Sequence, residues 1–198
     1  MEYRQLGNSG LMVSAMSPGT MTFGGKSKFA EVGSVGVDEA REAEYELLPI
    51  EVDQKLGALI WSPLGGGLLS GKYNRDNFRN VEGRFANGWD EPPVEDFDRL
   101  WNIVDVLDEI ASQKGISVAQ LSLAWTLSRP GVSSIVAGAR NATQLQDTLK
   151  AVDITLTAEE SERLNAVSRP QLLYPYWHQA RFICSRMGIA DHVLLDSY

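Results

Sequence analysis

Glycines and a lysine that follow a short apolar run make Gly57–Tyr73 the best candidate for chemistry in this sequence. The run Ala58–Trp61 is too short for a helix and predicts a buried strand, which Ser62-Pro63 ends because proline has no N–H. Glycines let backbone N–H groups turn toward an anion, and Lys72 adds a positive charge. We therefore predict a phosphate-binding loop here; a plain glycine-rich turn with a surface lysine is the alternative.

A nucleotide-hydrolase loop is the rival interpretation of the same residues. Gly66, Gly71 and Lys72 have the P-loop spacing. However, Tyr73 stands where a serine or threonine would hold magnesium, and residues 74–77 resemble a loop rather than the start of a helix. Both departures disfavour the P-loop.

A second anion-binding candidate follows another predicted strand, residues 133–137. Gly138-Ala139-Arg140 comes next, and Asn141 is placed to cap a helix. A helix N-terminus attracts anions, and the planar guanidinium of Arg140 suits a phosphate. A surface arginine near a helix cap is the plainer interpretation.

The remaining pattern indicates an α/β protein with parallel strands, in which ligands lie at the carboxyl ends of the strands. A turn cluster at residues 7–10 predicts an N-terminal hairpin. Glu and Ala content predicts a helix over 37–48, followed up to Leu56 by either a second helix opened by Pro49 or a kinked continuation, and helical periodicity predicts a helix from Phe97 up to Gly115. Capping signals at Ser117, Asn141 and Thr157 predict three more, and the tail from Gln171 gives no clear assignment.

Composition limits the classes of partner. The chain has 198 residues, 43% hydrophobic, with a net charge of −8, which disfavours nucleic acid and anionic membranes. One cysteine, Cys184, excludes an internal disulfide and suits a reducing compartment. With no leader or membrane span recognised, we expect a cytoplasmic protein without a metal site, since His178 and His192 lack companion ligands.

Taken together, these segments resemble the aldo-keto reductase family. Residues 4–14 resemble its N-terminal hairpin, and Gly19–Gly24 resembles its first barrel strand and loop. Residues 61–73 resemble the loop after the seventh strand, which lies along the cofactor pyrophosphate. Gly138–Arg140 and the helix behind it resemble the site after the eighth strand that holds the adenosine half.

The resemblance implies NADP as cofactor, because the position of Arg140 reads the 2′-phosphate in the family. Thr148 stands where the family often has asparagine. The implied cofactor-binding residues are Thr20, Met21, Trp61, Ser62, Pro63, Leu64, Gly67, Leu69, Gly71, Lys72, Gly138, Arg140, Gln144, Asp147 and Thr148.

The resemblance also exposes a gap. The family is an eight-stranded (β/α)8 TIM-type barrel of about 250 residues. Here residues 38–43 resemble the helix after strand one, and residues 44–49, which follow directly, resemble the helix after strand six, so strands two to six are missing. We therefore expect one domain, residues 1–198, that is an incomplete barrel of strands one, seven and eight with a seam near 43–44. Either the protein has lost the intervening segment or the sequence is shortened.

The family's catalytic Asp, Tyr, Lys and His fall in that missing sector, so no catalytic residue is assigned. The resemblance implies an oxidoreductase that reduces an aldehyde or ketone with NADPH; a non-catalytic NADP(H)-binding remnant or oligomeric scaffold is the alternative. Opening a barrel bares strand edges, so we expect a homo-oligomer that covers them.

Overall fold

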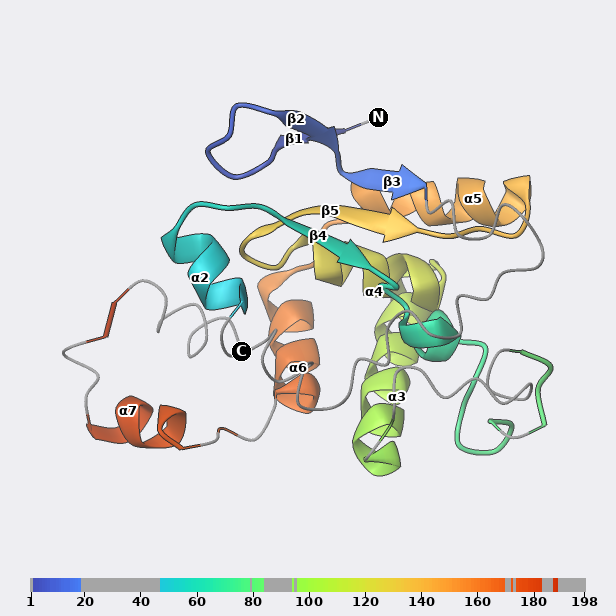
Figure 1. Ribbon diagram of the computed structural model, residues 1–198. Coiled ribbons are helices and arrows are strands. Elements are labelled where there is room, and N and C mark those ends of the chain that lie inside the picture. Colours follow the sequence, from blue (N-terminus) through green and yellow to red (C-terminus); the bar gives the residue numbers. More distant parts are fainter. Residues whose placement is uncertain are drawn as a thin grey trace, which may run out of the picture.

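The protein was analysed as a computed structural model, which describes residues 2–18, 47–78, 80–83, 94, 96–169, 172, 174–182 and 187–188. The fold is α/β, and the strands of these residues form two open sheets and no closed barrel (Figure 1). The expected helix over 37–48 and the segment after Pro18 fall almost wholly outside the described residues.

A small antiparallel hairpin opens the chain. Strands β1 (Tyr3–Gln5) and β2 (Met12–Ser14) pair as predicted around the glycine-rich turn. Gly7, at φ 53°, packs so closely on residues 55–56 that an added Cβ would lie 2.2 Å from the Lys55 carbonyl oxygen. The hairpin is also tied to the main sheet, since the Ser133 hydroxyl donates to the Gln5 carbonyl.

The main sheet has three parallel strands in the order β3-β5-β4. These are β3 (Met16–Pro18), β5 (Val132–Ala137) and β4 (Ala58–Trp61). Parallel strands in an α/β protein are as expected, and the order is the one that strands one, eight and seven would have as neighbours in a barrel. The central strand is the most buried, because it has a partner on each side.

Helices cover one face of this sheet (Figure 1). One hydrophobic core lies between the sheet and α4 (Val118–Leu127), with Met16, Leu123 and Ile135 buried. A second core joins α4 to α3 (Phe97–Lys114) and α6 (Ala158–Ser168). Helix α5 (Ala142–Leu149) follows β5, and α2 (Leu48–Asp53) precedes β4 with Pro49 in its first turn.

Strand β4 differs from the buried strand that its composition predicts. Ala58 is buried and Ile60 packs on the first core, but Leu59 is 48% and Trp61 53% exposed. The physical reason is that alternate side chains of a strand point to opposite faces, and described helices cover only one of them. An apolar run of four residues cannot by itself tell a strand covered on both faces from one covered on a single face.

Two further segments differ from expectation. The glycine-rich loop contains a kinked 3₁₀ segment, Gly65–Ser70, in which Gly66 and Gly67 have non-helical backbone angles, and the unassigned tail contains a short helix, α7 (Tyr176–Phe182). The predicted helix caps are confirmed: the side chains of Ser117, Asn141 and Thr157 each accept a hydrogen bond from the backbone N–H three residues on.

Candidate functional site

Both predicted anion-binding loops lie at the same edge of the main sheet. In the parallel register Trp61 is opposite Val136 on β5, and Pro18 is opposite Ala137, so all three strands end together. The loop after β4 and the loop after β5 therefore begin on neighbouring strands at their carboxyl ends (Figure 1). A ligand at this edge can contact both loops.

The first loop has a backbone that few residues other than glycine adopt. Gly65, Gly66, Gly67 and Gly71 have φ values of 52°, 64°, 104° and 77°, and Ser62 has 49°. The left-handed region is costly for residues with a Cβ, which explains why glycines dominate here. Two hydrogen bonds close the turn: Gly65 N–H donates to the Ser62 carbonyl and Gly67 N–H to the Leu64 carbonyl, each at 2.9 Å.

The apolar side chains of this loop anchor it to the body. Leu64 packs on the core beneath the sheet, while Leu68 and Tyr73 are almost fully buried beside Trp101 on α3. Gly71 lies against α4, where an added Cβ would be 2.8 Å from the Cβ of Val118. The loop is thus a fixed structure in which Ser62, Gly71 and Lys72 remain exposed and Gly67 half-buried.

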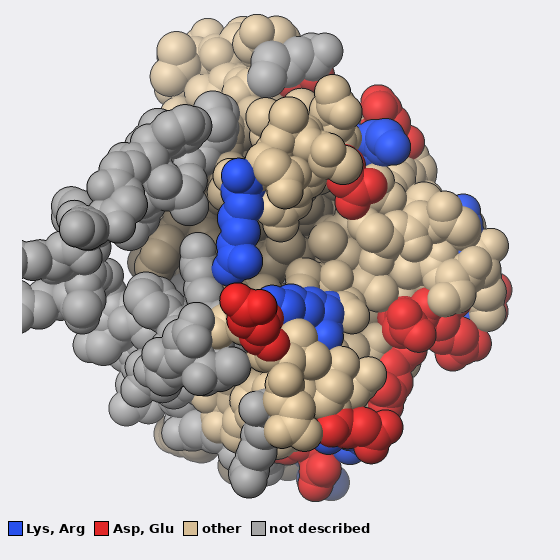
Figure 2. Space-filling view, turned by 90° about the vertical axis from the view of Figure 1, so that its right-hand side faces the viewer, with Lys and Arg blue, Asp and Glu red and all other residues tan. Residues whose placement is uncertain are grey.

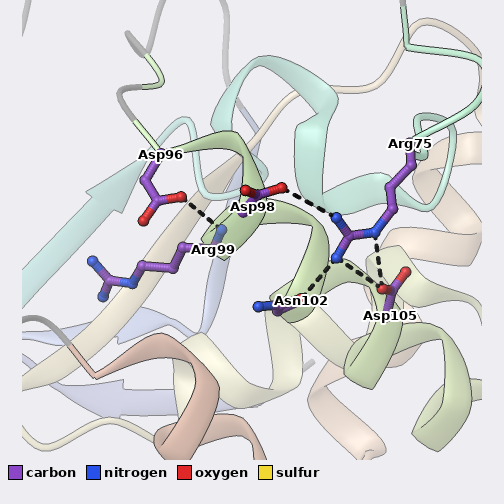
Figure 3. A network of polar contacts seen from close by, with 6 residues as sticks. All are labelled: Arg75, Asp96, Asp98, Arg99, Asn102 and Asp105. Carbon is purple, nitrogen blue, oxygen red and sulfur yellow. Dashed lines mark hydrogen bonds and ion pairs between the residues drawn. The ribbon is translucent and has the colours of Figure 1, made fainter.

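Lys72 lies at the end of the loop with its ammonium 5.4 Å from the centre of the Tyr73 ring. Its Nζ is also next to Gly83, where an added Cβ would come within 2.8 Å of it. The neighbouring cation Arg75 is bound differently (Figure 3): it donates to Asn102 at 2.7 Å and to Asp105 at 3.4 Å on α3. Arg75 therefore serves to hold residues 74–78 on α3.

The second loop leads into the N-terminus of α5. The Asn141 side chain accepts from the Gln144 N–H at 2.8 Å, and the Gln144 side chain accepts from the Arg140 N–H at 2.9 Å. Gly138, Arg140 and Gln144 are exposed, and a Cβ at Gly138 would meet nothing within 4 Å. The predicted cap at Asn141 is confirmed. The Gln144 side chain binds the backbone N–H of Arg140, whereas in a capping box it would bind that of Asn141.

Two of the predicted site residues face inward instead. Asp147 accepts from the Ser117 hydroxyl at 3.0 Å and from the Gln120 amide at 2.8 Å, and Thr148 is only 6% exposed. Sequence reasoning identified the Ser117–Gln120 capping box but not its contact with Asp147, for which local sequence carries no signal. Thr20 and Met21 lie outside the described residues.

Each of the two candidate loops carries an exposed cation, Lys72 or Arg140, on a protein that is acidic as a whole. No ion pair joins Lys72 or Arg140 to another described residue. Figure 2 views this edge: basic side chains lie near the middle of the face with an acidic side chain against them, and further acidic side chains lie toward the right. Within the described part of the chain there is no cluster of residues able to hold a metal ion. A helix long and apolar enough to cross a membrane is likewise absent from that part.

Comparison with known proteins adds independent evidence. Residues 35–169 match the model of the aldo/keto reductase family. A probable voltage-gated potassium channel subunit beta of Oryza sativa subsp. japonica is 38% identical over 148 residues, which are 68% of this chain and 43% of that protein. An uncharacterized oxidoreductase of Bacillus subtilis is 33% identical over 127 residues, 64% of this chain and 36% of the relative.

A third relative, L-glyceraldehyde 3-phosphate reductase of Escherichia coli O157:H7, is 31% identical over 115 residues, 56% of this chain and 33% of the reductase. The chain spans less than half the length of these curated relatives. The family model nevertheless covers well over half of the chain, and the parallel sheet and glycine-rich loop agree with it. The chain belongs to the aldo/keto reductase family.

Proposed function

We propose that this chain binds NADP(H) across the two loops at the carboxyl edge of the sheet. The observation that carries the proposal is that both loops begin on neighbouring parallel strands, each with an exposed cation that has no ion-pair partner among the described residues. In this proposal the pyrophosphate lies along residues 62–72. The adenosine half lies against α5, with Arg140 on the 2′-phosphate.

The residues fit such a ligand in shape as well as in charge. Gly67 and Gly138 leave open the space that a side chain would fill, since a Cβ at Gly67 would come no closer than 3.7 Å to its neighbours. Backbone N–H groups, a lysine and an arginine are the donors that phosphates prefer. Trp61, Ser62, Lys72, Arg140 and Gln144 can contact the ligand, whereas Leu64, Leu69, Asp147 and Thr148 support the loops from behind.

For the activity, we propose the reduction of an aldehyde or ketone to an alcohol. The bound cofactor would supply hydride, and a protein acid must supply the proton. The family's proton donor and its partners belong to the sector between strands one and seven that this sequence does not show. A cytoplasmic, NADP-dependent reductase is therefore the family-level proposal.

A second candidate is an NADP(H)-binding remnant that does not catalyse. It is favoured by the direct passage from residues 38–43 to residues 44–49, which removes the expected catalytic sector. General acid catalysis alone contributes roughly 10²–10⁴-fold. The test is to measure NADPH consumption across a panel of aldehydes. A chain that binds NADPH but does not consume it would support this candidate, and turnover would support the reductase.

A titration with NADPH and NADH tests the binding. We expect a preference for NADPH, and Arg140→Ala should weaken NADPH binding roughly tenfold to hundredfold while leaving NADH unchanged, because a charge-assisted pair is lost. Lys150→Ala is the matched control, since it removes an exposed cation just after the opposite end of α5. Equal affinity of the unmodified chain for both cofactors would refute the role of Arg140.

A further inference from the structure

Helix α4 is hydrogen-bonded both to the glycine-rich loop and to α5, the helix that follows the second candidate loop. On one side the Ser122 hydroxyl, which is 2% exposed, lies 2.9 Å from the Leu69 carbonyl oxygen in the glycine-rich loop. The same hydroxyl is 2.8 Å from the Val118 carbonyl within α4, so its single hydrogen is shared between two acceptors. The contact of Gly71 with Val118 lies one helical turn away on the same face.

On its other side α4 holds α5. The Gln120 amide, 4% exposed, donates both to the Asp147 backbone carbonyl at 2.9 Å and to its carboxylate at 2.8 Å. Ser117 donates to the other carboxylate oxygen at 3.0 Å. Asp147 lies in the last turn of α5 and Arg140 just before the Asn141 cap at the other end, so the contact with Asp147 reaches Arg140 through the short helix.

The direction of these contacts follows from helix geometry. Successive residues of an α-helix are about 100° apart, so positions 120 and 122 point to nearly opposite sides. Among the described residues no hydrogen bond joins residues 62–72 directly to residues 138–149. Apart from the ladder that pairs β4 with β5, the polar connection between the glycine-rich loop and α5 therefore runs through α4.

We propose that Gln120 and Ser122 are positioning residues that set the distance between the pyrophosphate loop and the 2′-phosphate site. The inference rests on the NADP(H)-binding proposal above. It predicts that a ligand spanning both loops depends on the two contacts together. A ligand that occupies the α5 side alone depends on Gln120 but not on Ser122.

The test compares NADPH with adenosine 2′-monophosphate, which has the 2′-phosphate but no pyrophosphate. For Ser122→Ala we expect NADPH affinity to fall about threefold to tenfold, as for one lost hydrogen bond, with adenosine 2′-monophosphate affinity unchanged. Gln120→Ala should weaken both ligands. Ser122→Thr keeps the hydroxyl and should restore the NADPH affinity.

The control is Thr126→Val, which removes another hydroxyl of α4; among the described residues that hydroxyl donates to the Ser122 carbonyl and has no hydrogen bond to either loop. A merely structural role for Ser122 would lower the melting temperature and weaken both ligands by the same factor. That result would overturn the proposal, because the ratio of the two affinities is the quantity that positioning changes.

Failure of the NADP(H)-binding proposal can be told apart from failure of the positioning role of Gln120 and Ser122. If the unmodified chain binds neither ligand, NADP(H) binding is wrong, and hydrogen exchange of the ligand-free chain still tests the role of α4. Ser122→Ala should then speed amide exchange in residues 68–73 but not in residues 144–149, and Gln120→Ala should do the reverse. Unchanged exchange in both variants would refute the proposal.

Discussion

Adding a single methyl group at Gly71 should cost stability for two separable reasons. The first is conformational: Gly71 has φ 77°, a backbone conformation that destabilises a residue with a Cβ by roughly 1–2 kcal/mol. The second is steric: the new Cβ would lie 2.8 Å from the Cβ and 2.9 Å from the Cγ2 of Val118. Forcing an extra carbon into a packed contact costs about 1–3 kcal/mol.

Gly115 offers a control that isolates the steric part. It ends α3 with φ 66°, nearly the same backbone, but a Cβ there would meet nothing within 4 Å. Gly115→Ala should therefore lower the free energy of unfolding by about 1–2 kcal/mol, the conformational part alone. Gly71→Ala should cost about 1–3 kcal/mol more.

Urea denaturation followed by circular dichroism measures both variants, and a double-mutant cycle with Val118→Ala measures the coupling. Removing the Val118 branches should recover part of the Gly71→Ala loss. Equal costs for Gly71→Ala and Gly115→Ala, with no coupling to Val118, would refute the claim that the loop is packed tightly against α4.

Three further predictions concern charge and the open sheet. The pKa of Glu160 is lowered, first because the Thr157 backbone N–H donates to its carboxylate and also because Lys114 binds it. The stability that this carboxylate adds to the fold is therefore complete above the usual carboxyl pKa and is lost as the pH falls. Glu160→Gln should lower the urea midpoint at pH 7, and this loss should shrink as the pH falls below the usual carboxyl pKa; an equal loss at every pH would contradict this. Burial raises the pKa of Glu51, whose Oε2 has no hydrogen-bond partner within the described part of the chain, so its ionised form opposes folding at neutral pH. Glu51→Gln should raise the urea midpoint at pH 7, with the gain fading as the pH falls through that raised pKa; a lower midpoint would show that the carboxylate stabilises the fold. Finally, the expected homo-oligomer should form through β4, so Leu59→Lys should weaken association in sedimentation velocity and Tyr174→Lys, at another exposed apolar position, should not. A parent chain that stays monomeric at every concentration would rule this out.

Much of the local structure could be predicted because its causes are local. The turn at residues 7–10, the caps at Ser117 and Thr157 and the strand before Ser62 each depend on a few neighbouring residues. The strand order came from the family resemblance, not from periodicity. The 3₁₀ segment was missed because glycine permits many backbones and indicates none of them.

The candidate site, too, could be predicted where its causes are local and not where they are distant in the chain. Lys72 and Arg140 stand out in the sequence as cations beside glycines, and the structure places both loops at one edge. Asp147 was assigned to the ligand, yet its carboxylate is bound by Ser117 and Gln120, about 30 residues away in the chain. Contacts of that range are set by how α4 and α5 pack, which no local pattern encodes.

The half-exposed face of β4 has a consequence for how the protein behaves in concentrated solution. Two copies that each carry a net charge of −8 repel each other at low ionic strength, which weakens association through the exposed Leu59 and Trp61 side chains. Salt at about 1 M shortens the range of that repulsion to roughly 3 Å while leaving apolar attraction intact. Association should therefore increase with ionic strength. Light scattering should grow with added sodium chloride, and Leu59→Lys should keep the solution clear.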